Sequence, residues 1–355
     1  MGRQSELIKR AGLAADEAIL VHDRSNLFYL SGYTGEGVLL VSGGVCAIVT
    51  DFRYAEQAQR ESPDYVLSLT DSVNTRYKRV SALLETAGVA KLRYEEDTVT
   101  VKELEHMREG MPLIQLHHVG SVIEKMREIK DPGELSALRK AADITSRAFA
   151  YIITFIREGL TEKEIALELQ HHILLLGADS LAFPSIVAAG ANGSLPHATP
   201  SAYRVRKGDM VTLDFGAKVG GYCSDMTRTV AVGSPGEEMR RVYQTVFEAQ
   251  QMAEKALEAG KIARDVDAVA RAFIEGMGYV GRFGHGLGHS LGIDIHENPR
   301  LSVSCEDQVR EGHLFTVEPG VYLPGLGGVR IENTCIVGGA GAEPITCGEK
   351  ELIIL

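Results

Sequence analysis

Two adjacent glycines in the middle of residues 210–232, MVTLDFGAKVGGYCSDMTRTVAV, constrain the fold of this chain more than any other feature. Gly220 and Gly221 form a favoured two-residue hairpin turn, and the segments on either side have the composition of strands. A hairpin closed at this turn places Asp214 and Asp225 on one face as diagonal neighbours, roughly 7 to 8 Å apart at Cα. The register predicts three facing pairs: Val219 with Tyr222, Gly216 with Asp225, and Asp214 with Thr227.

A second hairpin is predicted at residues 312–337, GHLFTVEPGVYLPGLGGVRIENTCIV, where the run PGLGG reverses the chain. Both arms alternate polar with apolar residues, which is typical of half-buried strands. Symmetric pairing about Gly325 sets Glu318 opposite Glu332, again on one face, unless a bulge shifts the register. The sequence therefore places a pair of carboxylates across a hairpin twice.

These four carboxylates need positive charge between them, because like charges that face each other in a sheet are destabilising. Between the two hairpins lies GHGLGHSLGIDIHENP, residues 284–299, which carries three histidines. Carboxylates joined by a nitrogen ligand suit two divalent ions about 3.5 to 4 Å apart that share a water. An oxygen-rich set favours Mn(II) or Co(II), with zinc as an alternative, and the absence of cysteine ligands argues against a structural zinc site.

The histidine segment does not match two better-known motifs. The zinc-protease motif H-E-x-x-H is absent, since no Glu stands between His285 and His289 to act as the base. A dinucleotide-binding G-x-G-x-x-G loop leads into a helix, whereas strand-like LGIDIH follows here. The remaining hypotheses are a metal site and a set of solvated histidines, and the neighbouring carboxylates favour the metal site.

Length and periodicity predict two domains, because 355 residues exceed what one hydrophobic core usually holds. Over residues 1–120, short apolar runs such as AILVHD, LFYLSGY and YVLSLT alternate with amphipathic helices, which indicates an α/β domain with a mixed sheet. Residues 121–355 begin with long helices, one near Pro132 and one behind a capping box of Thr161 and Glu164. Strands and two further helices follow, so the second domain is predicted to be α+β.

Charge and cysteine content exclude several classes of function. The net charge is −11 and no cluster of Lys or Arg stands out, so neither nucleic acid nor an anionic membrane is an expected partner. The sequence has neither a signal-peptide core nor the run of about 18 apolar residues that spans a bilayer. Five scattered cysteines without a C-x-x-C pair favour free thiols, and we expect a cytoplasmic protein.

Six short motifs, in this order, resemble those of the pita-bread metallopeptidases of family M24, and among them the proline-specific branch of aminopeptidase P and prolidase. They are LDFG (213–216), SDMTRT (224–229), GHGLGHSLG (284–292), IHENP (295–299), VEPG (317–320) and VRIENT (329–334). The resemblance covers the whole chain, since those enzymes also carry an N-terminal α/β domain. It implies a creatinase-like domain over residues 1–120, an α+β pita-bread catalytic domain over residues 121–355, and a homodimer.

The same resemblance implies a set of five ligands for two divalent metal ions: Asp214, Asp225, His289, Glu318 and Glu332. Asp225 and Glu332 resemble the carboxylates that bridge both ions. Glu318 resembles the ligand that also takes the proton from the bridging water.

Further catalytic roles are implied around the metals. His197 resembles the histidine that closes on the substrate, and Arg330 resembles the arginine that holds a ligand carboxylate in place. His285 and His296 resemble the pair that orients the substrate and stabilises the tetrahedral intermediate. Two more residues are assigned to substrate binding: Arg300 and Tyr322.

The activity that the resemblance implies is hydrolysis of the Xaa-Pro bond at the N-terminus of proline-containing peptides, as aminopeptidase P performs it. A strict Xaa-Pro dipeptidase (prolidase) is the alternative, because Arg300 directly after HENP is placed to bind the C-terminal carboxylate of a dipeptide. Methionine aminopeptidase shares the catalytic motifs but normally lacks a large N-terminal α/β domain, so residues 1–120 argue against it. A non-catalytic binding module and a metal-free creatinase-like hydrolase remain as other classes, and the five competent ligands argue against both.

Overall fold

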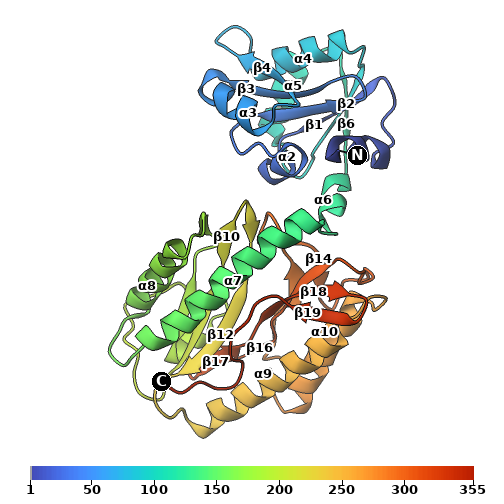
Figure 1. The fold of residues 1–355 in the computed structure, drawn as a ribbon. Coiled ribbons are helices and arrows are strands. Elements are labelled where there is room, and N and C mark those ends of the chain that lie inside the picture. The colour runs from blue at the N-terminus through green and yellow to red at the C-terminus, as the bar shows by residue number, and fades with distance from the viewer. Residues whose placement is uncertain (1) are drawn as a thin grey trace. The chain divides into compact units, whose positions relative to one another are not determined.

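The computed structural model describes residues 2–355 and divides into two compact units, with the boundary along the chain between Arg127 and Glu128 (Figure 1). Each unit buries its own hydrophobic core, as expected for independent domains. Among the described residues, no helix has both the length and the apolar character needed to cross a membrane.

The first unit is an α/β domain built on one six-stranded sheet of order β4-β3-β2-β1-β5-β6. All neighbouring strands are parallel except β2, which is antiparallel to β1 and β3, so the sheet is mixed as the sequence predicts. The strands are β1 (Glu17–Val21), β2 (Val38–Ser42), β3 (Cys46–Asp51), β4 (Val66–Thr70), β5 (Lys91–Tyr94) and β6 (Gln115–His118). The helices are α1 (Arg3–Arg10), α2 (Arg24–Ser31), α3 (Ala55–Glu61), α4 (Arg76–Thr86), α5 (Val101–Gly110) and α6 (Val122–Arg127).

The apolar run LFYLSGY, which its pattern does not mark as helical, lies mostly within α2. Asp23 caps this helix by accepting a hydrogen bond from the backbone N–H of Asn26, and Gly32 ends it in the left-handed conformation at φ 78°. Leu27, Tyr29 and Leu30 are buried, and α2 packs against α1 and α6, so burial stabilises a helix that propensity alone does not predict.

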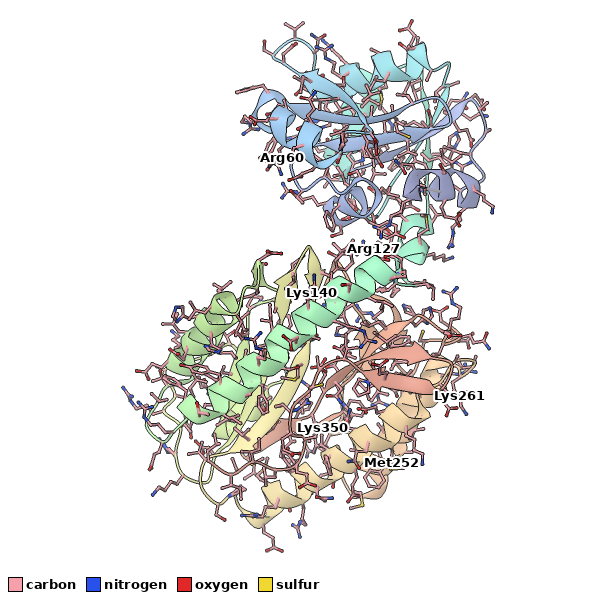
Figure 2. All side chains as sticks on the ribbon, in the orientation of Figure 1. Arg60, Arg127, Lys140, Met252, Lys261 and Lys350 are labelled. Atoms are coloured by element: carbon pink, nitrogen blue, oxygen red, sulfur yellow. The ribbon has the colours of Figure 1, made fainter. Side chains whose placement is uncertain are left out.

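Helix α6 packs on the first unit. Its Ile123 is fully buried, the Tyr29 hydroxyl donates to the Met126 carbonyl at 3.1 Å, and Arg127 (labelled in Figure 2) donates to the Asn26 side chain at 2.8 Å. The division between the units therefore falls after Arg127, whereas the sequence places it between residues 120 and 121 and counts this helix with the second domain.

The second unit surrounds short antiparallel strands with four helices. Helices α7 (Pro132–Phe155) and α8 (Glu162–Leu175) pack on the strands of its first half, and α9 (Glu237–Ala256) and α10 (Ala263–Gly276) pack on those of its second half (Figure 1). The first-half strands are β7 (Ser180–Leu181), β8 (Ile186–Ala189), β9 (Met210–Phe215), β10 (Ala217–Val219), β11 (Tyr222–Cys223) and β12 (Met226–Ala231). The second-half strands are β13 (Gly288–Ser290), β14 (Glu297–Leu301), β15 (Leu314–Val317), β16 (Gly320–Leu323), β17 (Gly327–Arg330), β18 (Asn333–Gly338) and β19 (Gly341–Pro344).

Both hairpins have the registers that their turns predict. In the first, Val219 faces Tyr222 and Thr227 faces Asp214. The strands cross closely at Gly216, where a Cβ would lie 1.8 Å from the Ser224 carbonyl oxygen, so only glycine fits there.

The second hairpin forms two consecutive ladders. β15 pairs with β18, ending at Val317 opposite Asn333, and β16 pairs with β17, starting at Gly320 opposite Arg330. Glu318 and Glu332 lie at the break between these ladders, where their side chains are free to leave the sheet.

The capping box predicted at the start of α8 is confirmed. The Thr161 side chain accepts from the Glu164 backbone N–H, and the Glu164 carboxylate accepts from the Thr161 backbone N–H at 2.7 Å. Two N–H groups that would otherwise lack a partner at the helix start are thereby satisfied.

We expect Thr161→Ala to lower the melting temperature by about 2 to 4 °C, because it removes one half of the capping box. Thr161→Ser keeps the hydroxyl and serves as the matched control, with a much smaller loss. Thermal unfolding followed by circular dichroism measures both variants. Equal losses in the two would contradict a capping role for the hydroxyl.

Candidate metal centre

The residues predicted to act in catalysis meet at a cavity of about 450 Å³ in the second unit. Ten of them line it: His197, Asp214, Asp225, His285, His289, His296, Arg300, Glu318, Arg330 and Glu332. Tyr322 is buried behind the cavity and reaches this group through its hydroxyl. The two hairpins and the histidine segment supply nearly all of these side chains, so the fold joins residues that lie far apart in sequence.

Three carboxylates form the centre of the site. Asp214, Asp225 and Glu332 each offer an oxygen atom, and these atoms all lie within 4.8 Å of one another. Each residue also has one buried carboxylate oxygen without a hydrogen-bond partner among residues 2–355. Unpaired buried carboxylate oxygens are costly in a folded protein, so this donor set fits divalent cations.

The pKa values of the three carboxyl groups also favour a cation site. Burial, reinforced by the neighbouring carboxylates, raises the pKa of Asp225 and of Glu332 well above the ordinary range. Burial also raises the pKa of Asp214, although the Arg330 guanidinium opposes the shift. Without cations the cluster therefore retains protons, which is the expected behaviour of acids too close together to ionise independently.

His289 presents the ring nitrogen that a metal requires. Its Nδ1 lies 3.0 Å from the Ser290 carbonyl oxygen, which only accepts, so in the neutral ring Nδ1 carries the hydrogen and Nε2 keeps its lone pair. Nε2 lies 3.3 Å from Oε1 of Glu318 and 3.7 Å from Oδ2 of Asp225. A carbonyl that fixes the tautomer behind a ligating histidine is a common feature of metal sites.

Thr316 connects two of the predicted ligands from behind. Its hydroxyl accepts from the His289 backbone N–H at 3.0 Å and donates to Oε1 of Glu318 at 2.9 Å. Thr227 connects one predicted ligand to Arg330, because its hydroxyl donates to Glu332 at 2.7 Å and accepts from Arg330 at 3.2 Å. Sequence reasoning missed both threonines as site residues, although the predicted register already sets Thr227 opposite Asp214.

A directed chain of hydrogen bonds crosses the site. Arg330 donates through Nη2 to Oδ2 of Asp214 at 2.5 Å and through Nη1 to the Tyr322 hydroxyl at 2.9 Å. His285 Nδ1 donates to the Gly286 carbonyl at 2.8 Å, so its Nε2 accepts from Tyr322, also at 2.8 Å. Burial lowers the pKa of His285, which keeps the ring neutral.

Both ring nitrogens of His285 are therefore engaged within the protein in this structure. Its Nε2 orients the Tyr322 hydroxyl, and the role of His285 in orienting the substrate stays a prediction. Tyr322 in turn holds Arg330, the residue that contacts Asp214.

The remaining predicted residues lie at the open side of the cavity. The His296 ring stands edge-on to that of His289 with ring centroids 4.5 Å apart, and the pKa of His296 is lowered by burial and by the neighbouring His289 and Arg300. His197 and Arg300 are exposed, and neither side chain has a hydrogen-bond or ion-pair partner among residues 2–355. These two side chains are available to a molecule that enters the cavity.

The glycines of the histidine segment serve close packing. A Cβ at Gly288 would lie 2.0 Å from the Thr316 carbonyl oxygen, and one at Gly286 would lie 2.9 Å from the Leu301 carbonyl oxygen. The segment thus lies directly against β15 and the end of β14, which agrees with the rejection of a phosphate-binding loop.

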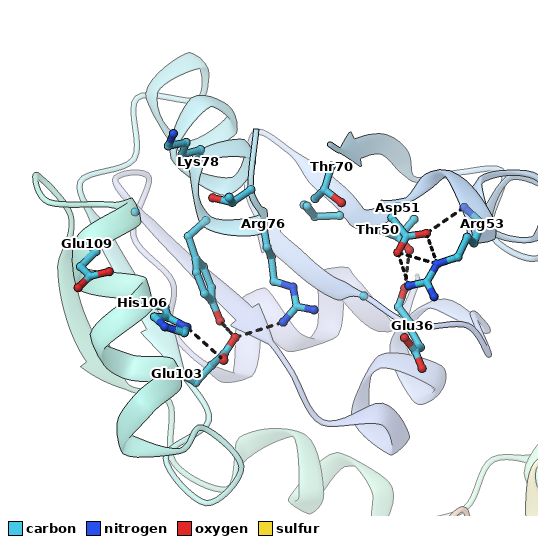
Figure 3. Close-up of a pocket in the computed structure, with 15 residues that line it drawn as sticks. Glu36, Thr50, Asp51, Arg53, Thr70, Arg76, Lys78, Glu103, His106 and Glu109 are labelled. Atoms are coloured by element: carbon cyan, nitrogen blue, oxygen red, sulfur yellow. Dashed lines mark hydrogen bonds and ion pairs between the residues drawn. The ribbon is translucent and has the colours of Figure 1, made fainter. Parts of the chain in front are cut away.

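A second cavity, of about 530 Å³, lies in the first unit at the ends of β3 and β4 and the start of α4 (Figure 3). Many of its charged side chains pair with one another: Arg53 binds Asp51, and both Arg76 and Tyr77 bind Glu103. Its acids carry no buried oxygen without a partner among the described residues. Of these two cavities, the one lined by the carboxylate cluster is therefore the one whose acids lack partners.

Comparison with known proteins agrees with the fold and the site. A model of metallopeptidase family M24 matches residues 136–338, and a model of the creatinase/prolidase N-terminal domain matches residues 3–129. The structure of a Xaa-Pro dipeptidase from Bacillus anthracis superposes with a TM-score of 0.95 at 38% identity, covering 99% of this chain and 100% of that chain.

Two further relatives are similar over almost their full length. The X-Pro aminopeptidase from Thermotoga maritima gives a TM-score of 0.91 at 33% identity, with 98% of this chain and 100% of that chain covered. The Xaa-Pro dipeptidase of Pyrococcus furiosus is 34% identical, with 99% of both chains covered. The predicted combination of an α/β domain with a pita-bread catalytic domain is thus confirmed, and the chain belongs to metallopeptidase family M24.

Proposed function

We propose that this protein is a Xaa-Pro dipeptidase that uses two divalent metal ions, Mn(II) or Co(II). The observation that carries the proposal is Arg300, an exposed guanidinium that lines the cavity and has no partner among residues 2–355. Arginine recognises carboxylates with paired hydrogen bonds, and the free carboxylate of a dipeptide lies one residue from the scissile bond. The names of several relatives, among them the dipeptidases of B. anthracis and P. furiosus, support the same choice.

Aminopeptidase P activity, the main interpretation of the sequence, becomes the second candidate. The similarity to the T. maritima X-Pro aminopeptidase favours it, because that relative has the same fold and is named as an aminopeptidase. An aminopeptidase accepts longer peptides, so a carboxylate contact at Arg300 would give it no advantage. Substrate length therefore separates the two candidates.

The proposed division of roles follows from the geometry. Asp214, Asp225, His289, Glu318 and Glu332 would hold the ions, which when bound lower the pKa of water and polarise the scissile carbonyl. Glu318 accepts the proton of the attacking water, since its carboxylate is fixed by Thr316. His296 and His197 face the entering peptide and stabilise the oxyanion, and Arg330 keeps Asp214 in place.

Proline suits such a site because a peptide bond to proline has no N–H and a fixed ring, so recognition cannot rely on extended-strand hydrogen bonds. All five cysteines are free thiols, which is consistent with the cytoplasmic location that we propose. We also propose that the protein forms a homodimer.

The first test measures hydrolysis of an Xaa-Pro dipeptide, its C-terminal amide and an Xaa-Pro-Xaa tripeptide. We expect the dipeptide to be cleaved best, and Arg300→Met to raise its KM by roughly 10- to 100-fold through loss of the charged hydrogen bond. The amide is the matched control, because it lacks the carboxylate and should respond little to the variant. Efficient cleavage of the tripeptide by both proteins would favour the aminopeptidase instead.

Removing the proposed base gives a second test. Glu318→Gln should lower kcat by about three orders of magnitude or more while the fold persists, because ligand charge and proton acceptor are lost together. Metal content is measured alongside turnover, and Glu306→Gln, at an exposed position, controls for the loss of one charge. Near-normal turnover in a metal-loaded Glu318→Gln protein would refute the assignment.

The raised carboxyl pKa values predict how metal binding depends on pH. The folded metal-free protein retains protons on Asp225 and Glu332 that the unfolded chain releases, so this contribution to stability is lost as pH rises above the ordinary carboxyl range. Metal ions replace those protons, so affinity rises with pH. We expect the gain in melting temperature on adding Mn(II) to grow from about pH 5 to about pH 8.

Chelator-treated protein provides the baseline for this measurement. Asp225→Asn, which removes one acid and one ligand, should show a small gain at every pH. A gain in the unaltered protein that does not vary with pH would contradict proton–metal competition at the cluster.

A further inference from the structure

Asp267 and Arg271 on α10 form a buried ion pair behind the metal centre. They lie one helical turn apart, with Nε of Arg271 2.8 Å from Oδ2 of Asp267 and Nη2 2.9 Å from Oδ1. The Asp267 side chain is fully buried and that of Arg271 is 21% exposed. Neither residue lines the cavity, and no step of the proposed mechanism uses them.

This ion pair is bonded to the backbone of residues 283–287, which we call the catalytic segment because it leads from Phe283 through His285 towards His289. Arg271 donates through Nη1 to the Phe283 carbonyl and through Nη2 to the His285 carbonyl, both at 2.8 Å. Asp267 accepts from the Leu287 N–H at 2.9 Å. Two side chains thus fix three alternate residues of the segment.

Ring contacts extend the same support to a side chain of the site. The Arg271 guanidinium lies over the Phe283 ring, 4.4 Å from its centroid. The Phe283 ring meets the His285 ring edge-on, with centroids 5.0 Å apart. The position of His285 is therefore coupled to Arg271 both through its carbonyl and through the aromatic ring beside it.

The two positions between these three residues, Gly284 and Gly286, have no side chain with which to hold the shape of the segment. Gly286 and the glycine that follows the segment, Gly288, lie in close contact with the backbone of residues 301 and 316, where no Cβ fits. Glycines have the greatest backbone freedom, so the conformation of this segment depends on bonds supplied from outside it. The pair on α10 supplies three of them, and the Glu318 N–H supplies another by donating to the Leu287 carbonyl at 2.8 Å.

We propose that Asp267 and Arg271 are positioning residues for catalysis, which fix the catalytic segment so that His285 holds Tyr322 and His289 faces Glu318. The proposal rests on the proposed peptidase function. An ion pair that served stability alone would need only its own two hydrogen bonds. This pair makes three more, to the backbone of every second residue from 283 to 287.

The test compares Asp267→Asn, Arg271→Met and Arg271→Lys with the unaltered full-length enzyme, saturated with Mn(II). We expect Asp267→Asn and Arg271→Met to lower kcat by roughly 10- to 100-fold, the usual effect of losing support behind a metal site, with a smaller change in KM. Arg271→Lys should recover part of the loss, since an ammonium keeps the charge but does not span the carboxylate and both carbonyls together.

Two control variants separate positioning from general stability. Arg264→Met removes the same charge from the same helix, but its partner is the exposed Glu306, and it should leave kcat unchanged. Leu169→Ala opens a cavity in the core between α8 and the first-half strands and lowers the melting temperature, and that core contains no residue of the catalytic segment. If Leu169→Ala and Arg271→Met lose the same kcat at matched melting temperature, the pair is merely structural and the proposal fails.

A second readout does not require activity. The absorption spectrum of Co(II) reports the geometry of its ligands, so Asp267→Asn and Arg271→Met should alter this spectrum and weaken Co(II) binding, while Arg264→Met should do neither. If the unaltered enzyme binds Co(II) but cleaves no Xaa-Pro peptide, the proposed function fails, and the spectrum alone decides the positioning role. A wild-type spectrum together with wild-type affinity in both variants would overturn it.

Discussion

Repulsion among carboxylates buried in one place is the constraint on which the rest of the second unit depends. Two hairpins bring Asp214, Asp225 and Glu332 within a few ångströms, and folding cannot bury such a group without something positive between the charges. The protein itself supplies Arg330, which reaches only Asp214. The remaining deficit is met by protons or by metal ions, so occupancy of the centre and stability of the fold are linked quantities.

The hydrogen bonds around the centre fix which groups donate and which accept. Thr227 and Thr316 each connect one acidic ligand to a neighbouring strand or side chain, and Tyr322 receives a bond from Arg330 while giving one to His285. Because each hydroxyl both donates and accepts, these residues transmit orientation from backbone to ligand. The ligands are thus preorganised before any cation arrives, which reduces the reorganisation that catalysis would otherwise require.

The sequence predicted the facing acids because strand periodicity and turn chemistry are local rules, and both hairpins obey them. It did not reveal that α2 is a helix or that α6 packs on the first unit, since both depend on burial against distant residues such as Leu27 and Ile123. The engagement of His285 by Tyr322, 37 positions away, was equally out of reach. So were the hydrogen bonds from Asp267 and Arg271 to the backbone of residues 283–287, because these contacts exist only once the fold is assembled.

The tautomer of His289 is set by the carbonyl of Ser290, an atom that every amino acid possesses. No exchange of the side chain at position 290 removes that acceptor, so the availability of the metal-binding nitrogen is insulated from point mutation there. Changes that tilt a peptide plane, rather than changes of residue type, are what would alter it. Which ring nitrogen of His289 is available to a metal therefore depends on the path of the main chain. That path changes more slowly in evolution than side chains do.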